Sequence, residues 1–216
     1  MRFQQIGGAY DWIVSLGCSC EPAAHLRRNG LRTASSPLDW VVSQSLSQVN
    51  RMLYNRFSGY MELDHMEQME GSADYVVDEE VQQEQRSYFI LDRQYDVLSV
   101  HDFPIVPGED WRVHYPAFKA KLDYRTERFL RKTAESRRAL FVRWGGSQLE
   151  AQQLQEVLAG LTGGEFRILM LQGIKGLEVA VDNRWQLPGV ASLSMPDSAG
   201  NHQIWDQILA SVSLIT

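Results

Sequence analysis

Residues 139–171 read ALFVRWGGSQLEAQQLQEVLAGLTGGEFRILML, and this stretch predicts the fold class. The run 139–143 is apolar enough to form a buried strand, and two glycines then break it. Ser147 and Glu150 have the spacing of a helix capping box, and apolar residues follow at helical spacing. A second apolar run, 166–171, completes a strand–helix–strand unit. Such strands, joined by a helix, favour a parallel sheet covered on both faces.

Strand and helix signals alternate along the rest of the chain. Further strands are expected near residues 12–14, 75–77, 88–91, 96–100 and 190–193. Further helices are expected over residues 20–28, 45–57, 116–138 and 204–212. We therefore predict a three-layer α/β sandwich with a mostly parallel central sheet, in a single α/β domain over residues 1–216. An α+β arrangement is the alternative.

Residues 60–87 differ from this alternation because they are acidic and rich in Met and Gln. We interpret them as a small hairpin or flap inserted into the domain. The acidic part, residues 62–84, is also a candidate docking site for a protein partner.

The composition of the chain excludes several classes of protein. A net charge of −6 and a pI near 5.4 argue against nucleic-acid binding, which needs clustered Lys and Arg. No apolar stretch approaches the ~20 residues that span a bilayer, and the first residues lack a signal peptide's apolar region. We expect a cytoplasmic protein without membrane contact, acting on a small molecule or a peptide.

Metal and cofactor signals are weak. The two cysteines, Cys18 and Cys20, are separated by one residue, which makes a strained disulfide, so reduced thiols are expected. With His25 and His101 they could supply four zinc ligands, yet no second Cys pair or regular His spacing supports a site. We expect no metal and no cofactor.

Cys20 lies where the strand near residues 12–14 gives way to the first helix. Ser19 is the expected N-cap and Pro22 suits the first turn, so Cys20 falls in that turn. The free N–H groups and positive dipole end of a helix favour a thiolate, whereas Glu21 opposes it. The alternative is that both cysteines are small buried hydrophobes.

Three predicted strands end in reactive or charged residues. Cys18 and Cys20 follow the first, His101 and Asp102 the second, and Arg143 and Trp144 the third. Ligands of open parallel sheets bind at the carboxyl ends of the strands. If the three strands are parallel neighbours, these side chains share one rim. A thiol beside an imidazole is the pair that nucleophilic acyl transfer requires.

Five stretches of this sequence resemble a known bacterial family. They are residues 15–20 (SLGCSC), 26–32 (LRRNGLR), 36–40 (SPLDW), 101–103 (HDF) and 140–143 (LFVR). The family is labelled as papain-like cysteine peptidases, and the resemblance covers nearly the whole chain. It places the family's cysteine on Cys20, with Cys18 as an extra thiol, and its His-Asp-Phe signature on residues 101–103. Leu38 stands where the family has an aromatic residue.

The resemblance implies a cysteine at a helix N-terminus and a histidine on an antiparallel sheet. It leaves the residue that orients His101 open. Asp102 adjoins His101, but neighbouring side chains of a strand point to opposite faces, so it can act only if the strand has already turned. Asp39, in the loop after the first helix, is the rival.

Three functional hypotheses follow. The first is a thiol hydrolase or acyltransferase for amides, peptides or thioesters, with Cys20 as nucleophile and His101 as base. The second is an enzyme or binding module for an anionic ligand, although the chain lacks the usual glycine-rich phosphate loops. The third is a non-catalytic interaction protein that uses its acidic segment. The predicted substrate-binding residues are Arg143, Trp144, Arg32 and Cys18.

Overall fold

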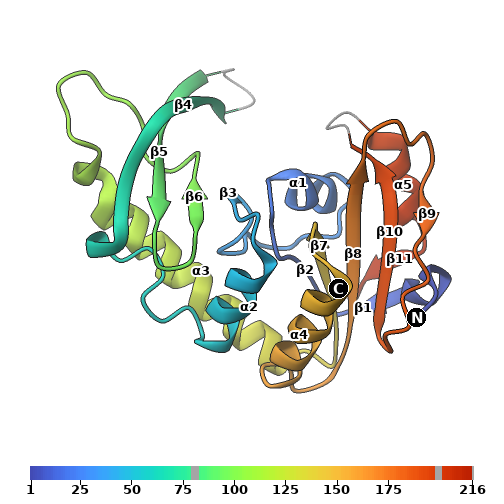
Figure 1. Cartoon of the computed structure of the whole chain (residues 1–216). Coiled ribbons are helices and arrows are strands. Elements are labelled where there is room, and N and C mark those ends of the chain that lie inside the picture. Colours follow the sequence, from blue (N-terminus) through green and yellow to red (C-terminus); the bar gives the residue numbers. More distant parts are fainter. Residues whose placement is uncertain (79–82, 198–200, 216) are drawn as a thin grey trace.

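The computed structural model describes residues 1–78, 83–197 and 201–215, and its centre is a five-stranded sheet (Figure 1). The strand order is β2-β7-β8-β10-β9. These strands are β2 (Trp12–Ser15), β7 (Arg138–Trp144), β8 (Glu165–Ile174), β10 (Val190–Pro196) and β9 (Val181–Asp182). The first four are parallel, and β9 is an antiparallel edge strand. The predicted α/β class with a mostly parallel sheet is confirmed.

Helices cover both faces of this sheet. Helices α1 (Glu21–Arg28) and α5 (His202–Leu209) share one apolar core with it, and α2 (Leu46–Tyr54) and α4 (Gln148–Ala159) share the other. In β7, Leu140 and Val142 face the first core and Phe141 faces the second, which is the alternation of a strand buried on both sides. The predicted three-layer sandwich is present.

The helix ends follow the local sequence. The Ser147 hydroxyl accepts the Glu150 N–H, and the Glu150 carboxylate accepts the Ser147 N–H at 2.8 Å, which makes the predicted capping box of α4. The last helix was predicted to reach residue 212, but α5 ends at Leu209. Val212 instead begins β11 (Val212–Leu214), which pairs in parallel with β1 (Gly8–Tyr10).

A second, antiparallel sheet has the order β3-β6-β5-β4. Its strands are β3 (Val41–Val42), β6 (Val97–Ser99), β5 (Gln83–Asp92) and β4 (Met66–Asp78). Strands β4 and β5 form the hairpin predicted within residues 60–87, but they are half of a sheet and larger than a small flap. Removing residues 62–84 would therefore remove all of β4 and the start of β5 from that sheet. The prediction that this segment docks a protein stays a prediction, and residues 79–82 lie outside the described chain.

The place of β6 corrects the expected geometry of the site. The shared rim required β6 to be a parallel neighbour of β2 and β7, but β6 pairs antiparallel with β5 and β3. Only residues 93–96 separate β5 from β6. A parallel crossover needs about a dozen residues, so such a short link permits only a hairpin.

Helix α3 (Tyr115–Glu135) joins the two sheets. It passes behind the antiparallel sheet and leads into β7 (Figure 1). Phe118, Leu122 and Phe129 on its inner face belong to the core that also contains residues of both sheets. No helix of the described residues is long and apolar enough to cross a membrane. Among the same residues, no group of three or more His, Cys, Asp or Glu side chains could hold a metal ion.

Candidate active site

The loop after β2 carries both cysteines in a fixed backbone conformation. Gly17 has φ +78°, and a Cβ there would lie 2.7 Å from the Leu38 carbonyl oxygen, so only glycine fits. Cys18 also has a positive φ, +90°, which is strained for a residue with a side chain. Its N–H donates to the Ser43 hydroxyl, and its carbonyl accepts the Ser43 N–H, both at 3.1 Å. These contacts hold the loop in the strained conformation.

Cys20 is the N-cap residue of α1, one position before the helix begins at Glu21. Ser19, the predicted N-cap, instead accepts the Glu21 N–H on its hydroxyl at 3.3 Å. Pro22 lies in the first turn, as expected, and the Ala24 N–H donates to the Cys20 carbonyl at 2.9 Å. The half-buried thiol of Cys20 is therefore fixed at the start of a helix.

His101 follows β6 and is held by the residues after it. The Phe103 ring is fully buried and packs against Trp111 and Phe118, with ring centroids 5.3 Å and 4.6 Å away. The Ser87 hydroxyl of β5 bonds both the N–H and the carbonyl of Phe103, each at 3.1 Å. These contacts fix the backbone at Phe103, two residues after His101, and so restrain the position of His101.

The thiol and the imidazole meet. Sγ of Cys20 lies 3.6 Å from Nε2 of His101, although the two residues are 81 positions apart in the sequence. The cysteine comes from a helix start beside the parallel sheet, and the histidine from the antiparallel sheet. This is the arrangement that the family resemblance implied.

Burial sets the protonation of the pair. It raises the pKa of the Cys20 thiol, the thiol's own backbone N–H lowers it, and the Glu21 carboxylate raises it again. Burial also lowers the pKa of His101, against the opposing effect of Asp102. Both shifts favour a neutral thiol and a neutral imidazole, whereas the helix dipole was expected to favour a thiolate. A neutral imidazole is the form that can accept a proton.

Asp102 is anchored beside His101. Its carboxylate accepts the Ser99 hydroxyl at 3.3 Å and pairs with the Lys121 ammonium of α3 at 2.9 Å. Its charge raises the pKa of His101, so the two groups interact electrostatically.

Asp39, the rival carboxylate, is fully buried in the loop between α1 and β3. Its Oδ2 accepts the Ser36 N–H at 2.7 Å and lies 3.2 Å from the Arg32 guanidinium. Burial raises the pKa of Asp39 to about 6 despite Arg32. Through these contacts Asp39 holds the loop between α1 and β3 in place.

Arg143 lies inside the fold, which differs from its predicted role as a substrate-binding cation. Its side chain is completely buried, and its guanidinium donates to the carbonyls of Leu16, Ser43 and Gln44 and to the Ser43 hydroxyl. Burial lowers its pKa to about 10. The guanidinium thus binds protein carbonyls beneath the cysteine loop in place of a substrate anion.

Two other predicted substrate-binding residues are also used by the fold. Arg32, with a side chain only 10% exposed, pairs with Asp39 and donates to the Ser35 hydroxyl at 3.0 Å. Trp144 stacks on Trp205 of α5 with ring centroids 6.0 Å apart. Both residues therefore pack the protein. Cys18, half-buried beside Gly145, keeps its predicted role as an untested expectation.

Comparison with known proteins places this site in a family. Residues 11–176 match the model of a family described as "Putative papain-like cysteine peptidase". The chain belongs to this family. The matched range includes Cys20, His101 and both candidate carboxylates.

One relative of this protein comes from a virus. It is "Uncharacterized protein R408" of Acanthamoeba polyphaga mimivirus, which is 25% identical over 151 residues, covering 68% of this chain and 68% of the relative. No solved structure matches the chain. The family description supports a cysteine hydrolase at a coarse level and names no substrate.

Trp40 is a site residue that the sequence reasoning did not assign. Its half-buried ring meets the His101 ring edge-on, with centroids 6.3 Å apart. The Arg32 guanidinium lies over the indole ring, 5.1 Å from the ring centroid. The signal was its place in the family stretch 36–40. Without the structure, nothing linked that stretch to residue 101.

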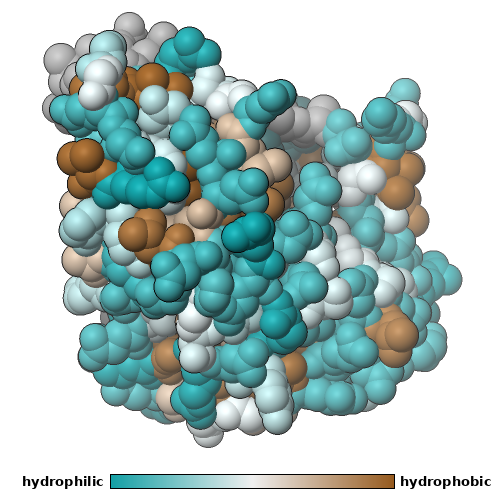
Figure 2. All heavy atoms as spheres, turned by 60° about the vertical axis from the view of Figure 1, so that its left-hand side comes forward, coloured by the Kyte–Doolittle hydropathy of each residue, from teal (hydrophilic) through white to brown (hydrophobic). Residues whose placement is uncertain are grey.

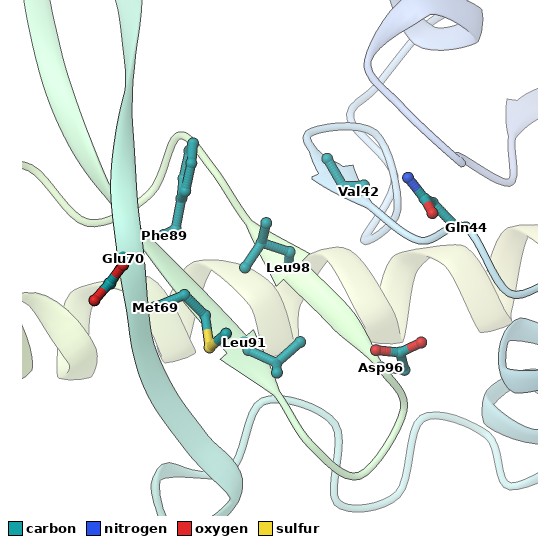
Figure 3. Close-up of a pocket in the computed structure, with 8 residues that line it drawn as sticks. All are labelled: Val42, Gln44, Met69, Glu70, Phe89, Leu91, Asp96 and Leu98. Carbon is teal, nitrogen blue, oxygen red and sulfur yellow. The ribbon is translucent and has the colours of Figure 1, made fainter.

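A groove runs along the antiparallel sheet, on the face opposite α3 (Figure 3). It has a volume of about 410 Å³ and is lined by Val42, Gln44, Met69, Glu70, Phe89, Leu91, Asp96 and Leu98. Five of these side chains are apolar and come from all four strands, whereas a solvent-facing antiparallel sheet normally carries polar side chains. One end of the groove, Val42, adjoins Ser43, which is bonded to Cys18.

The molecular surface shows where apolar side chains reach solvent. In Figure 2 the side that bears the β4–β5 hairpin is turned forward, and brown hydrophobic patches lie among hydrophilic atoms. Met69 of the groove is 40% exposed. The apolar lining of the groove is thus accessible from outside.

Proposed function

We propose that the protein is a cysteine-dependent hydrolase or acyltransferase that acts on an amide, a peptide or a thioester. Cys20 is the nucleophile, His101 is the general base, and Asp102 orients or polarises His101. The observation that carries the proposal is the 3.6 Å separation between Sγ of Cys20 and Nε2 of His101. Nucleophile and base within hydrogen-bonding reach are the minimum requirement of this chemistry.

The first half-reaction begins from the neutral pair. The Cys20 S–H proton passes to Nε2 of His101 while Sγ attacks the carbonyl carbon of the substrate. The tetrahedral intermediate collapses, the bond to the leaving group breaks, and His101 returns the proton to that group. A thioester on Cys20 results. Water, or another acceptor, then attacks this thioester with His101 again as base, the acyl C–S bond breaks, and His101 returns the proton to Sγ of Cys20.

Asp102 is preferred over Asp39 as the carboxylate partner. Asp102 acts on the pKa of His101, whereas the Asp39 carboxylate is occupied by Ser36 and Arg32. Lys121 and Ser99 hold Asp102 in place. A fixed negative charge near the imidazole stabilises the imidazolium that forms during attack.

The groove on the antiparallel sheet is the proposed binding site for the apolar part of the substrate. Its volume of about 410 Å³ lies in the range of small-molecule sites. An extended peptide or an acyl chain would place apolar groups on Phe89, Leu91 and Leu98.

Trapping of the acyl-enzyme tests the proposal. The protein is mixed with a panel of activated acyl esters and thioesters, and the adduct on Cys20 is located by fragmentation mass spectrometry. Wild type is expected to acquire the adduct, Cys20→Ala to lose it, and His101→Ala to form it about 10²–10⁴-fold more slowly, the usual contribution of a general base. Cys18→Gly is the matched control, because glycine accepts the positive φ of that position.

Two results would contradict the proposal. One is an adduct on Cys18 in place of Cys20. The other is equal acylation rates of wild type and His101→Ala, which would mean that the imidazole takes no part.

A further inference from the structure

A second hollow lies along helix α1, one helical turn beyond the candidate nucleophile Cys20. It has a volume of about 440 Å³ and is lined by Ala24, Arg27, Arg28 and Trp40. Counted from Cys20, the three helical residues lie at positions i+4, i+7 and i+8, which is one face of a helix. The hollow therefore lies on the same face of α1 as Cys20, and its lining includes two guanidinium groups.

Trp40 connects this hollow to the candidate base. Its ring forms the wall opposite α1 and meets the His101 ring edge-on at 6.3 Å. A group that occupies the hollow between Trp40 and α1 thus lies close to His101, the proposed base. The seven steps along the helix from Cys20 to Arg27 give an axial rise of about 10 Å.

The charges around the hollow are mostly positive. Besides Arg27 and Arg28, Arg32 lies within 5.1 Å of the Trp40 ring centroid. Two further arginines of α3, at positions 125 and 128, are near enough to Arg32 to lower its pKa, as is Arg27. Arg28 pairs with Asp206, and Arg32 pairs with Asp39. Both charged residues that line the hollow itself are arginines.

We propose that this hollow, lined by Ala24, Arg27, Arg28 and Trp40, binds an anionic group of the substrate about 10 Å from the carbonyl carbon that Cys20 attacks. The group is a carboxylate or a phosphate monoester, carried on an apolar or planar spacer that lies against the indole. The inference rests on the proposed function, because it uses Cys20 as the reactive end. It names a substrate class: anionic acyl compounds, including peptides that end in a free carboxylate.

Thiol-reactive probes of matched length test this inference. The probes are 6-(iodoacetamido)hexanoic acid, its neutral carboxamide, and the analogue that ends in a phosphate monoester. All three carry the same electrophile, so a difference between their alkylation rates is due to the terminal group at the other end of the probe. The alkylation rate of Cys20 is measured for each by fragmentation mass spectrometry, in wild type and in a variant carrying both Arg27→Gln and Arg28→Gln.

In wild type, at least one anionic probe is expected to react about tenfold faster than the carboxamide, the fold-change of one charge-assisted hydrogen bond. The faster of the two anionic probes identifies the group as carboxylate or phosphate. The ratio should fall toward one in the double variant and at high salt. Arg93→Gln is the control, because it removes one positive charge from an exposed residue in the β5–β6 turn and should leave the ratio unchanged.

Equal rates for anionic and neutral probes in wild type would overturn the inference, as would an anion preference that survives in the double variant. Both results leave the proposed function standing, because Cys20 still reacts. Failure of Cys20 to react with any of the three probes would instead contradict the proposed function.

Discussion

Cys20 and Glu21 are neighbours at the start of α1, and the carboxylate works against the thiolate. Papain-like chemistry needs a reactive sulfur, yet burial and Glu21 both raise the pKa of Cys20. The neutral imidazole of His101 then has to remove the proton during the attack. The proposed catalysis thus depends on the distance between Cys20 and His101 more than on a pre-formed ion pair.

Glu21→Gln is expected to lower the pKa of the Cys20 thiol, because it removes the negative charge that disfavours the thiolate. The thiolate fraction at a fixed pH below that pKa then rises, so iodoacetamide labels Cys20 faster. Labelling rates against pH, with peptide mapping, should show the midpoint displaced to lower pH. Glu178→Gln, at an exposed position, is the control. An unchanged midpoint would mean that Glu21 has no electrostatic effect on the thiol.

At the scale of elements, α1 and α5 are joined through a buried histidine. The His25 ring stacks on Trp205 with centroids 4.4 Å apart, and its Nε2 lies 3.4 Å from the Glu21 carboxylate. Burial, followed by the charges of His202 and Arg28, lowers the pKa of His25 to about 4, and Asp206 opposes the shift. His25 is therefore neutral in the folded protein at neutral pH.

Acid is expected to weaken the α1–α5 contact through His25. A folded pKa of about 4, against 6.5 in the unfolded chain, means that stability is present above pH 6.5 and is lost as the pH falls toward 4. The loss is about 3 kcal/mol, which corresponds to the difference between the two pKa values. The raised pKa of Asp39 acts in the opposite direction between pH 4 and 6, so total stability is a poor readout.

The difference in unfolding free energy between wild type and His25→Gln isolates the histidine. Urea denaturation at pH 7 and at pH 4 should show that difference shrinking by about 3 kcal/mol on acidification. A difference that is the same at both pH values would refute the assignment.

A second element-scale contact fixes His101. Phe103→Ala is expected to cost about 3–5 kcal/mol of folding free energy, since the ring fills a buried site between Trp111 and Phe118. Because the same ring anchors the segment that carries His101, acylation of Cys20 should also slow. Urea denaturation and the acyl-trapping assay measure the two effects, with Phe103→Leu as the milder control. If Phe103→Ala had the unfolding free energy and the acylation rate of wild type, the Phe103 ring would not be needed to hold His101.

At the scale of the whole molecule, Arg143 connects the parallel sheet to the loops that bear the site. From the end of β7 it bonds the carbonyl before the cysteine loop and two carbonyls after β3. These segments lead to Cys18 on one side and to the antiparallel sheet on the other. One buried side chain thus links both sheets.

Arg143→Met is expected to destabilise the protein by roughly 3 kcal/mol or more, because several buried carbonyls lose their donor at about 1–3 kcal/mol each. Arg143→Lys should recover part of the loss, since an ammonium keeps the charge but cannot reach all of the carbonyls at once. The measurement is the free energy of unfolding in urea. A denaturation midpoint equal to that of wild type in Arg143→Met would contradict this account.

Much of the architecture could be predicted because it depends on local signals. The apolar runs, glycine breaks and capping box of residues 139–171 predicted β7, α4 and β8, and the parallel sheet follows from their order. The extent of α5 was overestimated because Val212 continues the helical spacing. Its pairing with β1 is a long-range contact that periodicity cannot show.

The sequence by itself determined the α/β class, the turn that presents Cys20 and the stretches that carry the family resemblance. All of these depend on neighbouring residues, whose backbone preferences and apolar spacing can be read locally. The tertiary structure alone decided that His101 reaches Cys20 from an antiparallel sheet, that Arg143 lies inside the fold, and that Trp40 walls a basic hollow beside the pair. The physical reason is that a side chain's partner and its solvent exposure are set by strand pairing and helix packing between segments far apart in the chain.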